Sequence, residues 1–199
     1  MPRVTEAHLT ARRDQILDAA TERFAANGFQ ATGMADVIAA TGLSAGAVYR
    51  YFRSKDELIE AIVDRVLGRA AQRFETFLDE EPDPEPARAV ATAVDLISTV
   101  AGSGPVDMTR VAVQAWAEAL RNPAVGTVAR TAYGTMRGYF VEVARRAQRS
   151  GRLPADADPD MLGAALFSLL LGFLLQRLLL GDVAPEAYVA VVAALLPGS

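Results

Sequence analysis

Two tyrosines, an arginine and the only lysine of the chain lie within fourteen residues, 42–55, whose sequence is GLSAGAVYRYFRSK. The hydroxyls of Tyr49 and Tyr51 can donate hydrogen bonds to phosphate, and the guanidinium of Arg50 can bind both acceptors of a guanine edge at once. Lys55 adds a flexible positive charge. These residue types at this spacing favour a surface that binds phosphate and reads base edges.

A glycine turn between two helical patterns is expected to position these side chains. Gly42 follows a helical pattern over residues 34–41 and supplies a left-handed backbone, and Ser44 caps a short helix with Val48 and Phe52 on its buried side. This is a helix-turn-helix pattern, in which small residues let the backbone approach a DNA groove. The residues of the short helix that face outward or sideways are Ala45, Gly46, Ala47, Tyr49, Arg50 and Tyr51.

The start of a fourth helix adds an anion-binding feature. Ser54 and Glu57 have the spacing of a capping box, in which the hydroxyl and the carboxylate satisfy free backbone amides. The remaining free amides and the helix dipole attract phosphate, and Lys55 places its charge at the same position. We therefore expect a phosphate clamp at this helix start.

Two stretches, ILDAATERFAANGFQATGMADVIA and TGLSAGAVYRYFRSKDELIEAIV, resemble the DNA-binding domain of the tetracycline-repressor (TetR) family over roughly residues 10–63. The resemblance is carried, in order, by Phe24, Gly28, Thr32, Gly42, Ser44, Tyr49, Tyr51, Phe52, Lys55 and Leu58. It implies contacts to the DNA backbone from Thr32, Tyr49, Tyr51 and Lys55. It implies that the bases are faced by Ala45, Ala47 and Arg50. Gly33, Ser44 and Gly46 complete the expected DNA-binding surface.

Gly33 departs from the pattern of the family, in which a second threonine or serine commonly stands at the start of helix two. A hydroxyl contact to phosphate is therefore not expected at this position. A glycine can still cap the helix and offer its backbone amide to a phosphate.

The chain as a whole is expected to be all-α, because no segment alternates with period two and helical periods recur from end to end. Nine helices are predicted, at about 10–27, 34–41, 45–52, 55–78, 86–101, 106–120, 123–149, 159–180 and 185–196. Prolines and glycines mark most of the ends, and Pro82–Pro86 is the clearest connector. We expect a helix-turn-helix domain at 1–54 and a helical effector-binding and dimerisation domain at 55–199, joined by the helix at 55–78.

Composition limits the possible functions. The 199 residues, 51% hydrophobic, can bury a large core, and the absence of cysteine excludes disulfides and thiolate metal sites. With His8 as the only histidine, we expect no metal site, no cofactor and no catalytic residues. The first residues show no signal peptide and the apolar run from Met161 to Leu175 is short for a bilayer, so a cytoplasmic protein without membrane contact is expected.

Charge is unevenly distributed along the chain. The net charge is −4, but residues 1–55 carry seven basic and five acidic side chains, whereas residues 56–199 carry thirteen and nineteen. An N-terminal segment that can approach phosphate, attached to an acidic remainder, suits a localised DNA contact.

The resemblance implies a ligand pocket and a dimer interface in the C-terminal helices. Candidate ligand-binding residues are Met108, Gln114, Trp116, Tyr133, Met136, Arg137, Phe140, Phe167 and Gln176. The predicted helix at 159–180 is apolar nearly all round, which indicates burial on more than one side. Dimerisation is therefore assigned to this helix and the next, through Leu166, Leu170, Phe173, Leu174, Tyr188 and Val192.

These observations predict a homodimeric transcriptional regulator, a repressor that binds a pseudo-palindromic operator in double-stranded DNA and is released by a small hydrophobic or amphipathic effector. One alternative is a dimeric DNA-binding regulator that is controlled by a protein partner or acts constitutively, without a small-molecule pocket. A second is an enzyme with an appended DNA-binding module, whose chemistry would depend on carboxylates alone.

Overall fold

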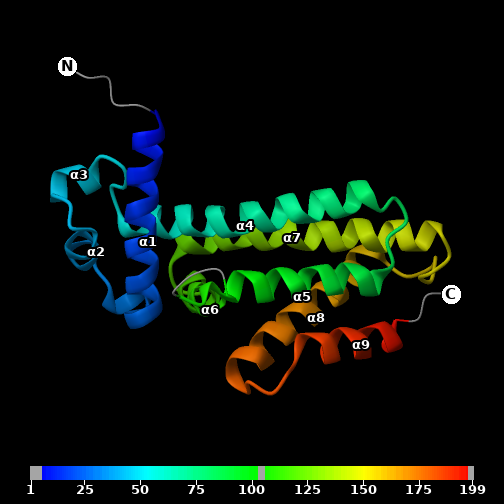
Figure 1. The fold of residues 1–199 in the computed structure, drawn as a ribbon. Coiled ribbons are helices and arrows are strands. Elements are labelled where there is room, and N and C mark those ends of the chain that lie inside the picture. Colours follow the sequence, from blue (N-terminus) through cyan, green and yellow to red (C-terminus); the bar gives the residue numbers. More distant parts are fainter. Residues whose placement is uncertain (1–5, 103–105, 197–199) are drawn as a thin grey trace. The chain divides into compact units, whose positions relative to one another are not determined.

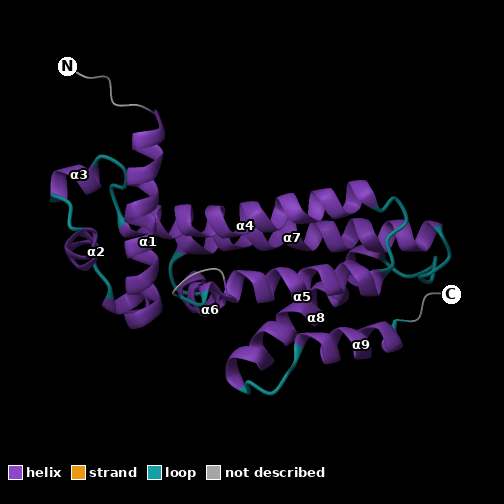
Figure 2. Cartoon of the chain, in the orientation of Figure 1, coloured by secondary structure: helices purple, strands orange, loops and turns teal. Residues whose placement is uncertain are grey.

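The computed structural model describes residues 6–102 and 106–196, and within them it contains nine α-helices and no strand (Figures 1 and 2). The prediction of an all-helical chain is therefore confirmed. The helices are α1 (Glu6–Ala31), α2 (Met34–Thr41), α3 (Ala45–Tyr49), α4 (Lys55–Glu80), α5 (Pro86–Gly102), α6 (Met108–Ala119), α7 (Pro123–Arg149), α8 (Pro159–Leu179) and α9 (Pro185–Leu195).

The first helix is longer than the predicted 10–27. It begins at Glu6, and after an interruption at Gly28, where φ is 80° and ψ is 164°, a further turn continues to Ala31. A non-glycine residue would be strained at this φ. Gly28 therefore ends the straight part of α1 as predicted, and the short turn after it leads towards α2.

The chain divides into two compact units. Unit 1 holds the described residues up to Arg65 and those between Gly102 and Arg130, so it combines α1 to α3 with the first part of α4, α6 and the first turns of α7. Its core is formed by Ile16, Leu17, Ala20, Phe24, Phe29, Val37, Val48, Phe52, Leu58, Ile59, Ala61, Ile62, Val111, Ala115 and Val125. The compact unit is thus larger than the predicted segment 1–54, whose role as the DNA-binding domain stays a prediction.

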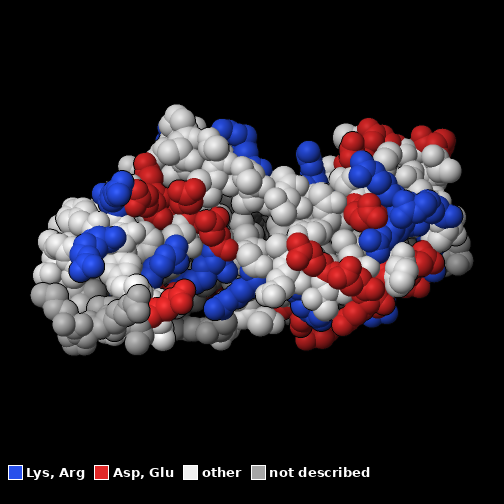
Figure 3. Space-filling model, turned by 90° about the horizontal axis from the view of Figure 1, so that it is seen from above, with Lys and Arg blue, Asp and Glu red and all other residues white. Residues whose placement is uncertain are grey.

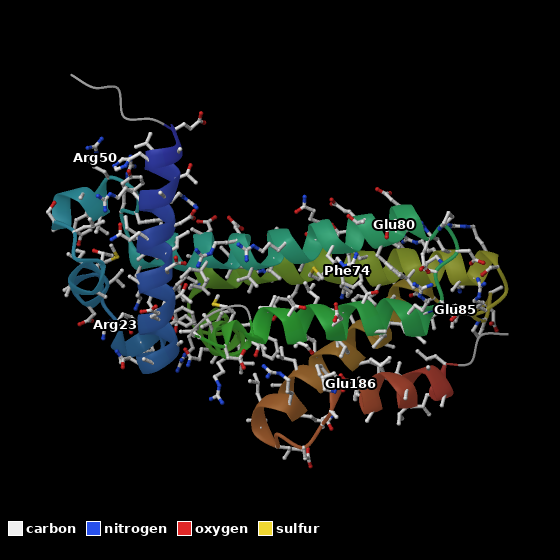
Figure 4. All side chains as sticks on the ribbon, in the orientation of Figure 1. Arg23, Arg50, Phe74, Glu80, Glu85 and Glu186 are labelled. Carbon is white, nitrogen blue, oxygen red and sulfur yellow. The ribbon has the colours of Figure 1, made fainter. Side chains whose placement is uncertain are left out.

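Unit 2 contains the remainder of α4 and α7 together with α5, α8 and α9. Phe74 of α4, labelled in Figure 4, is fully buried, and its ring centroid lies 5.2 Å from that of Phe140 on α7. Arg146 of α7 donates a 2.7 Å hydrogen bond to the carbonyl oxygen of Leu78, which satisfies a free carbonyl near the end of α4. Aromatic packing and this cap fix α7 against α4 within the unit.

Helix α8 is long and apolar enough to cross a membrane by length and composition alone, although the predicted apolar run was shorter. A core helix of a water-soluble protein passes the same test, so the length and composition of α8 are weak evidence for a membrane span. In unit 2, α8 contributes Leu166, Phe167, Leu170 and Phe173 to the hydrophobic core. Its apolar character is therefore used, at least in part, in packing within the chain.

Candidate nucleic-acid interface

The turn between α2 and α3 is fixed by local hydrogen bonds. Gly42 adopts the left-handed conformation with φ 67°, and the Leu43 amide donates to Oγ1 of Thr41 over 3.1 Å. Ser44 caps α3, because its Oγ accepts a 3.3 Å hydrogen bond from the Ala47 amide. The predicted glycine turn and serine cap are both present, and they set the direction of the short third helix.

One side of helix α3 is buried in the core of unit 1, and the other side is exposed. Val48 is fully buried, and Phe52, just after the helix, is 3% exposed, so these two side chains anchor α3 in the core of unit 1. Tyr49 is 47% exposed and Arg50 is exposed, and Figure 4 shows Arg50 at the end of α3. The small residues Ala45, Gly46 and Ala47 are exposed or half-buried, while Tyr51 packs partly against the core. The surface has the small and long residues that a recognition helix needs.

The start of α2 differs from expectation at Thr32. The Thr32 side chain is fully buried, and its hydroxyl donates to the carbonyl oxygen of Gly28 over 2.9 Å. A hydroxyl has only one hydrogen to donate. The hydroxyl thus holds the turn after Gly28 in this structure, and a phosphate contact through its hydrogen would require breaking this bond.

Gly33 caps α2 as expected, and its amide already has an acceptor in this structure. The amide donates a 2.7 Å hydrogen bond to Oδ2 of Asp36. A contact of this amide with a phosphate stays a prediction, and it would require this hydrogen bond to break.

The start of α4 contains the predicted cap in a modified form. The Glu57 amide donates to Oγ of Ser54 over 3.2 Å, as in a capping box. The Glu57 carboxylate accepts a 2.7 Å hydrogen bond from the amide of Arg53 instead of that of Ser54. Nζ of the half-buried Lys55 donates to the carbonyl oxygen of Phe29 over 3.0 Å. Lys55 therefore joins α4 to the last turn of α1 as well as carrying the expected charge.

Two residues that the sequence analysis did not single out also position this surface. Gln15 of α1 donates to the carbonyl oxygen of Thr41 over 3.0 Å and so holds the end of α2. The guanidinium carbon of Arg13 lies 5.2 Å from the centroid of the Phe52 ring. Both contacts join residues distant in sequence, so no local pattern could indicate them.

The predicted ligand-binding residues are divided between the two units. Met108, Gln114 and Trp116 belong to unit 1, where all three are half-buried and Oε1 of Gln114 is buried without a hydrogen-bond partner. In unit 2, three of the predicted residues lie in the core: Met136, Phe140 and Phe167. The remaining ones are Tyr133, which is half-buried with a pKa raised by its burial, and the exposed Arg137 and Gln176. Their role in binding a ligand stays a prediction.

A separate groove of about 350 Å³ lies in unit 1, between the starts of α4 and α7. It is lined by Ser54, Asp56, Glu57, Ile59, Glu60, Ala124, Val125, Thr127 and Val128. None of these residues belongs to the predicted ligand-binding set.

Most residues predicted to form the dimer interface are buried within the protomer. Leu166, Leu170, Phe173, Leu174 and Val192 are at most 7% exposed. Tyr188 is half-buried, and its hydroxyl donates to the carbonyl oxygen of Leu169 over 2.7 Å. These side chains hold unit 2 together, and little of their surface is left for a second chain.

Sequence comparisons agree with this geometry. Residues 16–62 match the family model of bacterial regulatory proteins of the tetR family, and residues 86–198 match that of the C-terminal part of BetI-type transcriptional repressors. The HTH-type transcriptional repressor Rv1474c of Mycobacterium tuberculosis is 30% identical over 188 residues, which cover 92% of this chain and 90% of the relative. The HTH-type transcriptional regulator UidR of Escherichia coli is 29% identical over 177 residues, covering 85% and 82%.

Solved structures share the fold at lower identity. A putative transcriptional regulator from Saccharomonospora viridis in complex with choline has a TM-score of 0.72 and 23% identity, covering 93% of this chain and 95% of that one. A SmeT–triclosan complex has a TM-score of 0.74 and 22% identity, covering 93% and 91%.

The capped turn and the exposed third helix define a DNA-binding protein of the helix-turn-helix class. The chain belongs to the tetR family of bacterial regulatory proteins, and its function is transcription regulation through DNA binding.

Proposed function

We propose that the chain is a cytoplasmic homodimeric repressor that binds a pseudo-palindromic operator through α3 and is released by a small hydrophobic or amphipathic effector. The observation that carries the DNA-binding part is the exposed surface of α3. Val48 and Phe52 anchor the helix, so Tyr49 and Arg50 extend outward from a rigid support. In this proposal Arg50 reads base edges and Tyr49 donates to a phosphate.

The proposed dimer interface lies on the outward sides of α8 and α9. On α9, Ala187, Val191, Ala194 and Leu195 are exposed and apolar and lie on one side of the helix, while the exposed Glu186, Ala190 and Ala193 lie beside them. On α8 the exposed side includes Met161, Ala165, Ser168, Gln176 and Leu179, of which Met161 is 67% and Leu179 77% exposed. Exposed apolar patches of this kind mark protein–protein contacts. Family regulators bind DNA as dimers, which supports this assignment.

The test of the DNA-binding proposal is selection of duplexes from a randomised library by the parent protein, followed by footprinting. We expect two symmetric half-sites separated by about one helical turn or a multiple of it, because a twofold dimer places its recognition helices ~34–36 Å apart in the simplest arrangement. A single asymmetric half-site would contradict the proposal.

The role of Arg50 is tested on the same duplexes. Arg50→Ala should cost about 1–3 kcal/mol in binding to the selected duplex and relax the preference at particular base pairs. Arg23→Ala is the matched control, since Arg23 is an exposed arginine of α1 outside the predicted surface. If Arg50→Ala weakened binding to selected and scrambled duplexes equally, Arg50 would contact phosphate only.

That the effector is a small molecule is supported by the compounds bound to the two solved relatives, choline and triclosan. Of these, triclosan is hydrophobic and choline is a small organic cation. Trp116, the only tryptophan, is half-buried on α6 and provides a fluorescent reporter. An effector must bind the DNA-free state more tightly than the DNA-bound state, because a ligand with equal affinity for both states would not shift the equilibrium between them.

Choline and triclosan themselves are the first probes. We expect one of them, or an analogue, to change Trp116 fluorescence over the same concentrations that release DNA, and Trp116→Leu to bind DNA while losing much of the response. If a folded Trp116→Leu variant responded to the effector like the parent, Trp116 would have a packing role only. If no compound released DNA, control by a protein partner would be favoured.

A further inference from the structure

Arg13 of α1 is held above a buried aromatic ring beside the recognition helix. Its guanidinium carbon lies 5.2 Å from the centroid of the Phe52 ring, within the ~6 Å range in which a cation is attracted to an aromatic face. Phe52 is 3% exposed and follows directly after Arg50 and Tyr51. The position of the Arg13 guanidinium is therefore tied to the segment that joins α3 to α4.

The Arg13 guanidinium has no anionic partner in the part of the chain that the structure describes. Among the described residues, no carboxylate lies within 4.0 Å of Arg13, and the same holds for Arg50 and Arg53. Other arginines are paired: Arg65 and Arg121 of unit 1 each lie within 4.0 Å of a carboxylate. The same holds for five arginines of unit 2, which are Arg88, Arg145, Arg146, Arg149 and Arg152. Figure 3 shows both signs of charge interspersed over the face that it displays.

The contact with Phe52 does not use the hydrogen-bonding capacity of Arg13. A guanidinium carries five N–H donors, and attraction of its charge to an aromatic ring requires no hydrogen bond. Arg13 is also an exposed residue. A phosphate accepts two such donors at once in a charge-assisted, bidentate geometry.

We propose that Arg13 is a further DNA-binding residue, which binds a backbone phosphate next to the contacts of α3 and is preoriented by its contact with the Phe52 ring. The inference rests on the proposed use of α3 as the recognition helix. Because a phosphate contact carries no sequence information, Arg13 strengthens binding to every duplex alike and positions α3 without reading bases.

The test compares Arg13→Gln and Arg13→Lys with Arg23→Gln. Arg23 is the matched control, because it is also an exposed arginine of α1 without a carboxylate within 4.0 Å, and Figure 4 shows it far along α1 from Arg50. The probes are a duplex selected by the parent protein and a scrambled duplex of the same length. Binding is measured over a series of salt concentrations, and thermal unfolding is followed without DNA.

The slope of log K against log salt is negative, and we expect Arg13→Gln to make it shallower by about 0.9 per protomer for both duplexes. Arg13→Lys should keep most of this slope, since the charge remains, and Arg23→Gln should leave it unchanged. A lower unfolding temperature of Arg13→Gln with the parental salt slope would overturn the proposal and leave Arg13 a packing residue. An equal loss in Arg23→Gln would also overturn it, because the effect would then be one of net charge.

These outcomes are separate from those of the proposed function. The proposal that α3 is the recognition helix would be contradicted if the parent selected no duplex. It would also be contradicted if Arg50→Ala bound the selected duplex as tightly as the parent. If Arg50→Ala weakened binding as expected and Arg13→Gln did not, only the assignment of Arg13 would fail.

Discussion

The ammonium group of Lys55 donates a 3.0 Å hydrogen bond to the carbonyl oxygen of Phe29, a residue 26 positions earlier in the chain. This bond joins the first residue of α4 to the turn of α1 that follows Gly28. An ammonium carries three hydrogens, so two remain for other acceptors. One side chain can therefore hold α4 against α1 and bind a phosphate at the same time.

Lys55→Ala should accordingly have two separable effects. We expect it to weaken binding to all duplexes alike and to lower the salt slope by about one unit per protomer, because one phosphate contact is lost. We also expect a loss of about 1 kcal/mol in the free energy of unfolding, because the Phe29 carbonyl loses a charged donor at a half-exposed position. Salt titration of DNA binding and urea unfolding measure the two effects. A loss of stability with the parental salt slope would show that Lys55 only joins the helices.

Gly33→Thr should restore the hydroxyl that this chain lacks at the start of α2. Gly33 has an extended backbone, with φ −97° and ψ 172°, and an added Cβ would lie in ordinary contact, 3.5 Å from Oδ2 of Asp36. We expect the variant to fold with a stability within a few tenths of a kcal/mol of the parent. It should bind selected and scrambled duplexes several-fold more tightly, because the new hydroxyl can donate to a phosphate.

The matched control is Gly42→Thr, at a glycine whose φ is +67°. A threonine is strained in this left-handed conformation, so a loss of about 1–2 kcal/mol in stability is expected. Unchanged DNA affinity of a folded Gly33→Thr protein would mean that no phosphate lies within reach of this position.

Local signals were sufficient to predict the helices and some of their caps. Gly28, Gly42 and Ser44 act through their own backbone conformation or through a hydrogen bond to a residue three positions away. Such features are encoded within a few residues, so sequence spacing identifies them. The remaining errors at helix ends are of one to four residues.

The burial and the contacts of particular side chains depend on tertiary structure and could not be predicted from local sequence. Burial of the Thr32 hydroxyl requires the turn after Gly28, and the position of Arg13 requires Phe52, which lies 39 residues later. Four of the six predicted dimer residues lie on α8, a helix apolar on nearly every side. Its pattern could not show which side packs within the protomer, and the side with Leu166 proved to be buried.

Leu195→Asp should dissociate the dimer without unfolding the chain. Leu195 is 70% exposed at the end of α9, so a charge there costs little in the monomer but would be buried in the proposed interface. Sedimentation should show a monomer at micromolar concentration together with weaker binding to a two-half-site duplex. Leu166→Asp is the contrasting variant, because at 4% exposure it should unfold unit 2. A dimeric Leu195→Asp protein would place the interface elsewhere.

The close contact of α8 with α7 at Gly163 gives a prediction about stability within unit 2. A Cβ added to Gly163 would lie 2.6 Å from both the backbone nitrogen and the Cα of Val141. Such a distance is a steric clash, and relieving it requires a backbone shift that costs free energy. Gly163→Ala should therefore lower the free energy of unfolding by about 1–3 kcal/mol or more, as overpacking does.

Gly138→Ala is the matched control for this contact, since Gly138 is also helical and an added Cβ would meet nothing within 4 Å. Removing a glycine from a helix interior at such a site should raise the free energy of unfolding by about 0.5–1 kcal/mol. Urea unfolding of both variants measures the difference. If Gly163→Ala were as stable as Gly138→Ala, α8 could not pack against Val141 as closely as the structure has it, and the outward side of α8 assigned to the dimer would have to be redrawn.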